Sequence, residues 1–247
     1  MVTGASSGFG KAIAEKFAQS DDHLIITARR KDLLYALKDD LEQQYKINVL
    51  PLVFDVRDKN EVFKAVASIS GEWRDIDVLV NNAGLALGRD SFEDADMDDW
   101  ETMIDTNVKG LLYVSKAIIP FFIERNKGHI INMGSIAAKE VYDKGNVYCA
   151  TKAAVDSISQ AMRIELLKNN IKVTAIHPGA ALTEFSIVRF KGDQTKADAV
   201  YQGFKPLTGE DVADTVYYCC GLPDHVCIND LVIMPTAQAS ALYFHRL

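Results

Sequence analysis

The sequence predicts an α/β protein in which a single Rossmann-type, doubly wound parallel sheet is flanked by helices on both faces. Short apolar runs alternate with longer segments of helical periodicity along the whole chain, which is typical of repeated βαβ units. A glycine-rich turn at residues 3–10 leads directly into the first helical segment, as in folds that hold a phosphate group at a helix N-terminus. The 247 residues, 48% of them hydrophobic, are enough for one large domain with a well-buried core. We therefore expect residues 1–247 to form a single domain.

The expected elements alternate along the chain. The apolar runs that predict strands are residues 1–3, 23–28, 48–54, 76–80, 129–133, 172–176 and 231–234. The periodic segments that predict helices are residues 11–20, 31–45, 59–69, 97–125, 148–169 and 210–221. Residues 178–205 show no clear periodicity, and a stretch of that length is typical of a functional lid. We interpret it as the loop that selects the substrate.

Composition excludes several classes of function. The net charge of -7 and the pI near 5.3 argue against binding to nucleic acid or to anionic membranes, because both require a basic face. No segment resembles a signal peptide or a membrane span, so we expect a cytoplasmic protein. The four cysteines and five histidines have neither disulfide nor metal-site spacing, which predicts buried free thiols and no metal.

The glycine-rich turn and the end of the second strand together predict a dinucleotide cofactor. Glycines allow backbone amides and a helix N-terminus to approach a pyrophosphate. NAD enzymes usually carry an acidic residue at the end of the second strand, where it binds the ribose 2′-hydroxyl. Here this position holds Arg29 and Arg30, and two guanidinium groups suit a 2′-phosphate. We therefore predict NADP(H) rather than NAD; the alternative is that the two arginines form only a solvated start to the next helix.

Tyr148 and Lys152 predict a site of proton transfer. They lie four residues apart in a segment of helical periodicity, so they would share one face of a helix. A neighbouring ammonium stabilises a phenolate, and Lys152 would thereby lower the pKa of Tyr148 from its usual value of about 10. Ser135 follows an apolar run and would hydrogen-bond a carbonyl oxygen at the same site. Alternatively, the tyrosine and the lysine form only a surface pair. A second pair with this spacing, Tyr201 and Lys205, has no serine partner and we consider it incidental.

These motifs occur in the order found in one protein family. With the glycine-rich turn, residues 81–84 (Asn-Asn-Ala-Gly), Asn107, Ser135, the Tyr148 and Lys152 pair, and the dipeptide Pro178-Gly179, the whole chain resembles the short-chain dehydrogenase/reductase family. The resemblance implies that Tyr148 is the catalytic acid and base and that Lys152 binds the nicotinamide ribose. It also implies that Ser135 holds the substrate oxygen and that Asn107 holds a proton-relay water. The first strand has fewer apolar residues than is usual in the family, which suggests a slightly truncated chain.

The resemblance also implies a set of cofactor-binding residues. Asp55 would contact the adenine, Asn82 and Gly84 would line the cleft, and Thr183 would hold the nicotinamide carboxamide. The full set is Gly4, Ser6, Ser7, Gly8, Phe9, Gly10, Arg29, Arg30, Asp55, Val56, Asn82, Ala83, Gly84, Tyr148, Lys152, Pro178, Gly179 and Thr183. Structural roles remain open for some of them. Asp55 would then cap the helix near residue 59, Asn82 would brace strands, and Pro178-Gly179 would only turn the chain.

Residues 183–193 and the C-terminal residues 234–246 resemble the NADP-dependent 3-hydroxy acid dehydrogenases, a group that includes serine 3-dehydrogenase and malonic semialdehyde reductase. This resemblance implies a small hydroxy-acid substrate, such as serine, allo-threonine or 3-hydroxypropionate, and a homotetramer. A substrate carboxylate requires a cation, and Arg89, Lys139 and Arg189 are candidates, of which we favour Arg189. Two alternatives stay open: a short-chain reductase of another carbonyl substrate, such as a sugar, steroid or polyketide, and a non-catalytic NADP sensor.

Overall fold

The chain folds around one seven-stranded parallel sheet. The computed structural model describes residues 1–247, and the strand order is β3-β2-β1-β4-β5-β6-β7. The strands are β1 (Val2–Thr3), β2 (Leu24–Ala28), β3 (Val49–Val53), β4 (Val78–Asn81), β5 (Gly128–Met133), β6 (Ile171–Pro178) and β7 (Asp230–Ile233). All neighbouring strands pair in parallel. The strand order reverses between β1 and β4, which is where doubly wound sheets bind ligands.

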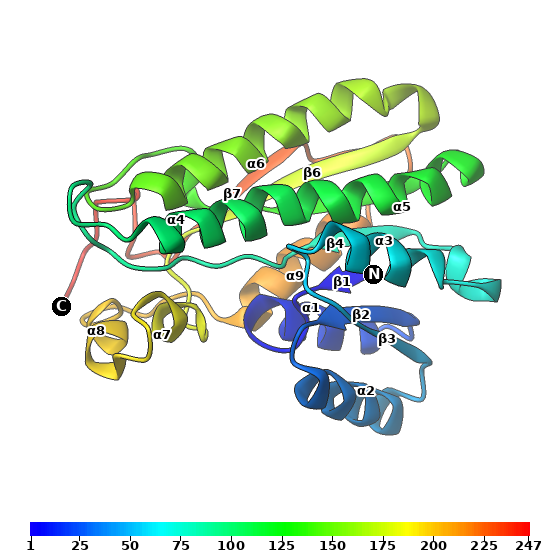
Figure 1. The fold of residues 1–247 in the computed structure, drawn as a ribbon, viewed down its shortest axis with the longest axis horizontal. Helices are drawn as coiled ribbons and strands as arrows, with labels where there is room; N and C mark the ends of the chain where they lie inside the picture. The colour runs from blue at the N-terminus through cyan, green and yellow to red at the C-terminus, as the bar shows by residue number, and fades with distance from the viewer.

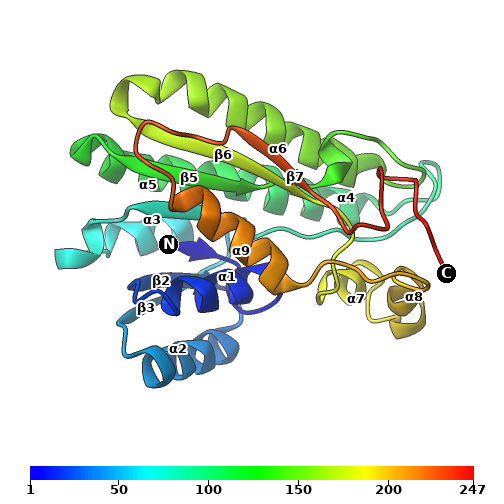
Figure 2. The same cartoon turned by 180° about the vertical axis from the view of Figure 1, so that it is seen from behind.

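Helices cover both faces of the sheet, which confirms the predicted fold class (Figure 1). The helices are α1 (Gly8–Ala18), α2 (Lys31–Tyr45), α3 (Lys59–Ala67), α4 (Met97–Ile104), α5 (Leu111–Arg125), α6 (Asn146–Glu165), α7 (Phe185–Arg189), α8 (Gln194–Ala199) and α9 (Gly209–Cys220). One apolar core lies under α1, α2 and α9, and a second lies under α3 and α5. Seen from behind, α1 and α9 lie side by side across the first of these faces (Figure 2).

The sequence accounts for the central and edge strands in different ways. Every residue of β2 and β5 is buried, as expected for parallel strands with helices on both faces. The edge strand β3 is partly exposed and contains Pro51, which an edge position tolerates because proline has no N–H to donate. None of the helices combines the length and apolar character needed to cross a bilayer.

Two of the predicted elements differ from the structure. The segment 97–125 is not one regular helix, because a π-helical turn, Asp105–Gly110, separates α4 from α5. The stretch 178–205, predicted as a loop, contains the two short helices α7 and α8. The remaining predicted helices are present, with ends that differ by a few residues.

A row of buried polar side chains lies within the second core. The Asn81 amide on β4 donates to Ser115 Oγ on α5 at 2.8 Å and to Asn132 Oδ1 on β5 at 2.9 Å. The Asn132 amide in turn donates to Ser159 Oγ on α6 at 2.9 Å. We call these four residues the polar row. All four cysteines are free, but only Cys149 and Cys219 are buried.

Candidate active site

The carboxyl ends of the strands open onto two adjoining cavities, of about 310 Å³ and about 820 Å³. The smaller cavity lies over β1, β2 and β4, and the larger one lies between β5, β6 and the segment 178–205. Phe9, Gly134, Tyr148, Thr183 and Phe185 line both cavities. The Tyr148 side chain therefore stands at their boundary.

The glycine-rich turn forms the floor of the smaller cavity. Gly4 and Gly8 have φ angles of 66° and 52°, which side-chain-bearing residues rarely adopt. Gly10 packs under the turn, where a Cβ atom would lie 2.3 Å from Gly4 O and 2.5 Å from Asn82 Nδ2. The Ser7 side chain makes no hydrogen bond that caps α1, so the first N–H groups of the helix stay available for an anion.

Arg30 and the turn hydroxyls form a cationic rim on the smaller cavity. The Arg30 guanidinium donates to Ser6 Oγ at 3.1 Å and to Ser7 Oγ at 2.7 Å. It also lies 3.4 Å from a Glu184 carboxylate oxygen at the start of α7. Arg29 lies on the same rim, 3.5 Å from Asp55 Oδ2. The side chains of both arginines remain about half exposed, at 54% for Arg29 and 48% for Arg30, so a ligand can reach them.

Asp55 and the segment after β4 form the sides of the cavity. Burial alone would raise the pKa of Asp55, but hydrogen bonds from Arg57 outweigh it and hold that pKa below its usual value. Asp55 does not cap the next helix, since Asp58 accepts the capping bonds. The Asn82 amide does brace strands, as one alternative held, because it donates to Thr3 O at 2.9 Å. Asn82 also lines the smaller cavity.

Most of the expected cofactor-binding residues line this one cavity. Gly10 lies beneath it, while Pro178 and Gly179 line the larger cavity instead. Sequence reasoning missed Thr27, Ala28, Phe54, Leu85, Thr106, Met133, Gly134, Glu184, Phe185 and Val188, which also line it. Several of these flank predicted residues at strand ends and could have been found from that position. The residues of α7 carry no such signal, because they reach the cavity only through the tertiary fold.

Tyr148, Lys152 and Ser135 come together at the boundary of the cavities. Tyr148 and Lys152 lie one turn apart on α6, and each is only 7% exposed. The Lys152 ammonium is 6.0 Å from the centre of the Tyr148 ring and donates to Met133 O at 2.8 Å. Ser135 follows β5, with its hydroxyl accepting a hydrogen bond from the Ala137 N–H. The pair is buried in the site, which excludes the alternative of a surface pair.

The predicted lowering of the Tyr148 pKa is wrong for this structure. Burial raises the pKa of Tyr148 above its usual 10, and Tyr142 adds to this effect, whereas Ser135 and Arg189 oppose it. Lys152 does not offset the burial, because its ammonium points to the Met133 carbonyl. Burial also lowers the pKa of Lys152 to about 8.

Asn107 lies in the π-helical turn, next to the site but outside both cavities. Its amide exchanges two hydrogen bonds of 2.8 Å with the Leu85 backbone and donates to Thr151 Oγ1 at 3.1 Å. Gly84 separates this amide from Lys152, since a Cβ at Gly84 would lie 3.2 Å from Asn107 Oδ1 and 3.5 Å from Lys152 Nζ. π-Helical turns frequently mark functional sites. The proton-relay role of Asn107 stays a prediction.

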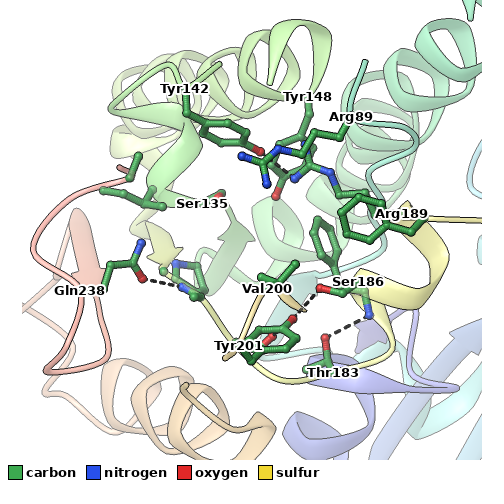
Figure 3. A pocket seen from close by; sticks show the side chains of 18 of the residues that line it. Arg89, Ser135, Tyr142, Tyr148, Thr183, Ser186, Arg189, Val200, Tyr201 and Gln238 are labelled. Carbon is green, nitrogen blue, oxygen red and sulfur yellow. Dashed lines mark hydrogen bonds between the residues drawn. The ribbon is translucent and has the colours of Figure 1, made fainter. Parts of the chain in front are cut away.

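The larger cavity carries cations beside Tyr148 (Figure 3). The Arg189 guanidinium lies 5.5 Å from the centres of both the Tyr142 and the Tyr148 rings and donates to the Tyr142 hydroxyl at 2.8 Å. Arg89 lies 5.9 Å from the Tyr142 ring. Lys139 is not among the lining residues, because its ammonium pairs with Asp156 and Asp230. Of the three cations predicted from the sequence, Arg189 and Arg89 therefore remain as candidates for binding a substrate anion.

The segment 178–205 forms one wall of the larger cavity. The Tyr201 hydroxyl lies 2.6 Å from Ser186 Oγ and donates to Ala181 O at 2.7 Å. These bonds tie the beginning, middle and end of the segment together. Tyr201 therefore has a structural role in the cavity wall (Figure 3), separate from the Tyr148 centre.

Comparison with known proteins gives close relatives over the full length. NADP-dependent 3-hydroxy acid dehydrogenase of Salmonella typhi is 48% identical, with 100% of this chain and 98% of the relative covered. Sulfoacetaldehyde reductase 2 of Chromohalobacter salexigens is 43% identical, with 97% and 94% covered. The closed form of a serine dehydrogenase complexed with NADP+ superposes with a TM-score of 0.92 at 48% identity, covering 100% of this chain and 98% of that chain.

The family model for the short chain dehydrogenases matches residues 1–194. This match spans the glycine-rich turn, the Tyr148 centre and the first part of the cavity wall. Together with the full-length relatives, it confirms the family to which the sequence motifs pointed. The chain belongs to the short-chain dehydrogenase family.

Proposed function

We propose that the chain transfers a hydride between NADP(H) and the 3-hydroxyl or 3-oxo carbon of small 3-hydroxy acids. The observation that carries this proposal is the position of Tyr148, between the smaller cavity, lined by the glycine-rich turn, and a second cavity in which the Arg189 guanidinium lies 5.5 Å from the centre of the Tyr148 ring. Relatives at 48% identity are named as a 3-hydroxy acid dehydrogenase and a serine dehydrogenase, which supports the same substrate class. The proposed substrates are serine, allo-threonine and 3-hydroxypropionate, together with malonic semialdehyde, which is the oxidised form of 3-hydroxypropionate.

The smaller cavity fits a phosphorylated dinucleotide. Gly10 fits against Gly4 and Asn82 with no room for a side chain, and the uncapped end of α1 offers N–H groups for a pyrophosphate. Arg30, Ser6 and Ser7 form a cationic and hydroxyl-bearing rim, which suits a 2′-phosphate. When bound, NADP(H) would supply the nicotinamide carbon that accepts or donates the hydride.

The chain supplies proton transfer at the substrate oxygen. In reduction, the neutral Tyr148 phenol donates its proton to the oxygen as negative charge develops there. The Ser135 hydroxyl donates a hydrogen bond to the same oxygen and so stabilises that charge. In oxidation, the Tyr148 phenolate accepts the hydroxyl proton. Lys152 would bind the nicotinamide ribose and hold a positive charge beneath the site.

A substrate carboxylate would bind to Arg189, with Arg89 nearby. Arg189 is the cation that faces Tyr148 from the larger cavity, and its hydrogen bonds to Gly88 O and the Tyr142 hydroxyl fix its guanidinium in place. A guanidinium binds a carboxylate through two parallel hydrogen bonds. This contact would place the 3-carbon of a short acid near the phenol.

A second candidate substrate class is a small aldehyde that bears a sulfonate. One relative at 43% identity is named a sulfoacetaldehyde reductase, and the same two arginines would bind a sulfonate. A panel of serine, allo-threonine, 3-hydroxypropionate, 3-hydroxyisobutyrate, sulfoacetaldehyde and bulky alcohols, each with NADP(H) and NAD(H), separates these classes. The highest kcat/KM on a bulky neutral alcohol would exclude both.

The Tyr148→Phe variant tests the chemistry. It should lower kcat by about 100-fold or more, because the acid and base is lost, while fluorescence titration shows unchanged NADPH binding. Tyr218→Phe, at an exposed position on α9, is the matched control and should keep wild-type rates. Wild-type turnover in Tyr148→Phe would contradict the assignment.

A further inference from the structure

A fully buried histidine, His177, holds the turn that carries Ser135. His177 lies near the end of β6 and has no exposed surface. Its Nδ1 atom lies 3.1 Å from Ser135 O and 3.3 Å from Ser135 N. A Cβ on Gly134 would stand 2.4 Å from this same atom. Glycine at position 134 is therefore what allows the ring to reach the backbone of Ser135.

Two carboxylates stand on the other side of the ring. His177 Nε2 lies 3.1 Å from Asp230 Oδ1 on β7 and 3.7 Å from Asp156 Oδ1 on α6. The contact with Asp230 is an electrostatic one, since it is not aligned as a hydrogen bond. The three side chains could together hold a metal ion, but the Lys139 ammonium already lies 2.9 Å from Asp156 Oδ2 and 2.5 Å from Asp230 Oδ2. The Lys139 ammonium thus supplies the positive charge that a metal ion would otherwise bring to this cluster.

The same cluster fixes the turn from both ends. Ser135 caps the short 3-10 helix Ile136–Ala138, and Lys139 follows directly after it. The backbone of Ser135 is held by His177, and the side chain of Lys139 is held by the two aspartates. The turn between them forms part of the wall of the larger cavity through Ser135 and Ile136.

The protonation of His177 decides which hydrogen bond Nδ1 makes. A bare Nδ1 accepts from the Ser135 N–H, whereas a protonated Nδ1 donates to Ser135 O. The carboxylates of Asp230 and Asp156 favour the proton on Nε2, which leaves Nδ1 bare. Burial and the Lys139 ammonium lower the pKa of His177 and outweigh the opposing effect of Asp230, which favours the neutral ring.

We propose that His177, supported by Asp230 and Asp156, is a positioning residue that holds the Ser135 peptide so that its hydroxyl points at the reacting oxygen. The proposal rests on the proposed role of Ser135 in hydride transfer. His177 does not touch the reacting atoms and acts through the Ser135 N–H. A displacement of a reacting group by about 1 Å can cost about 100-fold in rate, so this support has a measurable effect on kcat.

Three variants separate positioning from bulk packing. His177→Leu removes both ring nitrogens and should lower kcat by about 10- to 100-fold with little change in NADPH binding. His177→Asn keeps an amide oxygen near the place of Nδ1 and should retain most of the activity. His177→Gln keeps a polar atom near the place of Nε2 only and should behave like His177→Leu. Equal kcat values for the Asn and Gln variants would overturn the proposal.

His129→Leu is the matched control. His129 is a buried histidine at the start of the neighbouring strand β5, and its Nε2 lies 2.8 Å from Thr174 Oγ1. The strands are parallel, so His129, near the amino end of β5, lies at the opposite end of the strands from the site, which is at their carboxyl ends. This variant should lower the thermal unfolding temperature without lowering kcat. A loss of kcat equal to that of His177→Leu would overturn the proposal.

A double-mutant cycle completes the test. Ser135→Ala should lower kcat by itself, and adding His177→Leu should then cost less than about threefold more, since the two residues act as a unit. Losses that multiply would overturn the positioning role of His177 and leave the proposed function standing. An unchanged kcat in Ser135→Ala would instead overturn the role of Ser135, and the role of His177 with it.

Discussion

At the scale of single residues, the raised pKa of Tyr148 predicts different pH dependences for the reductive and the oxidative rates. Burial keeps the phenol protonated, which is the form that donates a proton to a carbonyl oxygen. We expect the reductive kcat to vary little between pH 6 and 8, and the oxidative kcat to rise with pH, because oxidation requires the phenolate. Rates in both directions across this range, with saturating substrate and cofactor, provide the measurement. An oxidative rate independent of pH would contradict this expectation.

Lys152 couples the site to stability. Its folded pKa of about 8 lies below its usual 10.5, so between these values the folded chain binds fewer protons than the unfolded chain, and stability rises with pH. Below pH 8 the buried ammonium destabilises the fold. We expect Lys152→Met to be inactive but to unfold at a higher temperature than the wild type at pH 7, and the difference should shrink as pH rises from 8 to 10.5. The exposed Lys64→Met serves as control and should show no such trend.

The site residues were predictable from their spacing and order along the chain, but the environment of each side chain was not. Tyr148, Lys152 and Ser135 were found from their spacing together with the other motifs that occur in order along the chain, and the structure brings the three side chains together. The direction of the Tyr148 pKa was not predictable, since it depends on how deeply the phenol is buried and on where the Lys152 ammonium points. His177 was also missed, because its partners come from β7 and α6, which lie far away in the sequence.

At the scale of elements, α7 supplies the cation that we assign to the substrate anion. Arg189→Met should lower kcat/KM for a carboxylate substrate by about 10- to 100-fold, as expected for the loss of a charge-assisted contact, with most of the change in KM. Arg189→Lys should recover part of the loss. Lys64→Met, which removes one exposed positive charge from α3 outside both cavities, is the control for net charge. An unchanged KM for serine in Arg189→Met would exclude Arg189 as the anion site.

Three elements, the π-helical turn and the helices α7 and α8, could not be predicted from the sequence for physical reasons. The chain stays helical through the π-helical turn at Asp105–Gly110. The apolar pattern of residues 97–125 is therefore uninterrupted and gives no sign of the turn. Helices α7 and α8 have five and six residues, too few for a periodic pattern to stand out. They are stabilised by tertiary contacts such as those of Tyr201, which the sequence does not display.

At the scale of the whole molecule, the expected homotetramer stays a prediction. Ile104 on α4 and Leu112 and Ile123 on α5 are 40%, 40% and 44% exposed, and apolar side chains grouped on neighbouring helices favour an interface. Light scattering coupled to size-exclusion chromatography should give four copies for the wild type and fewer for Leu112→Lys. Leu33→Lys on α2, away from these helices (Figure 1), should leave the mass unchanged. A wild-type monomer would contradict the prediction.

The architecture as a whole was predictable because alternation of apolar and periodic segments determines it locally. Each βαβ unit buries its strand beneath its own helix, so the order of elements predicts the parallel sheet without knowledge of distant contacts. The two cavities required the fold itself, since their walls combine strand ends with the segment 178–205.

The polar row of Asn81, Ser115, Asn132 and Ser159 has a consequence for how faithfully the chain assembles. Apolar side chains alone do not prevent two strands from pairing with a register shifted by two residues, because the same side chains still face the core. In such a shifted register the Asn81 and Asn132 amides would be buried without their hydrogen-bond partners, at a cost of about 1–3 kcal/mol for each unsatisfied group. The polar row thereby destabilises shifted registers of β4 and β5. Folding alone, without cofactor or substrate, then fixes the register of the strands beneath α6, the helix that carries Tyr148.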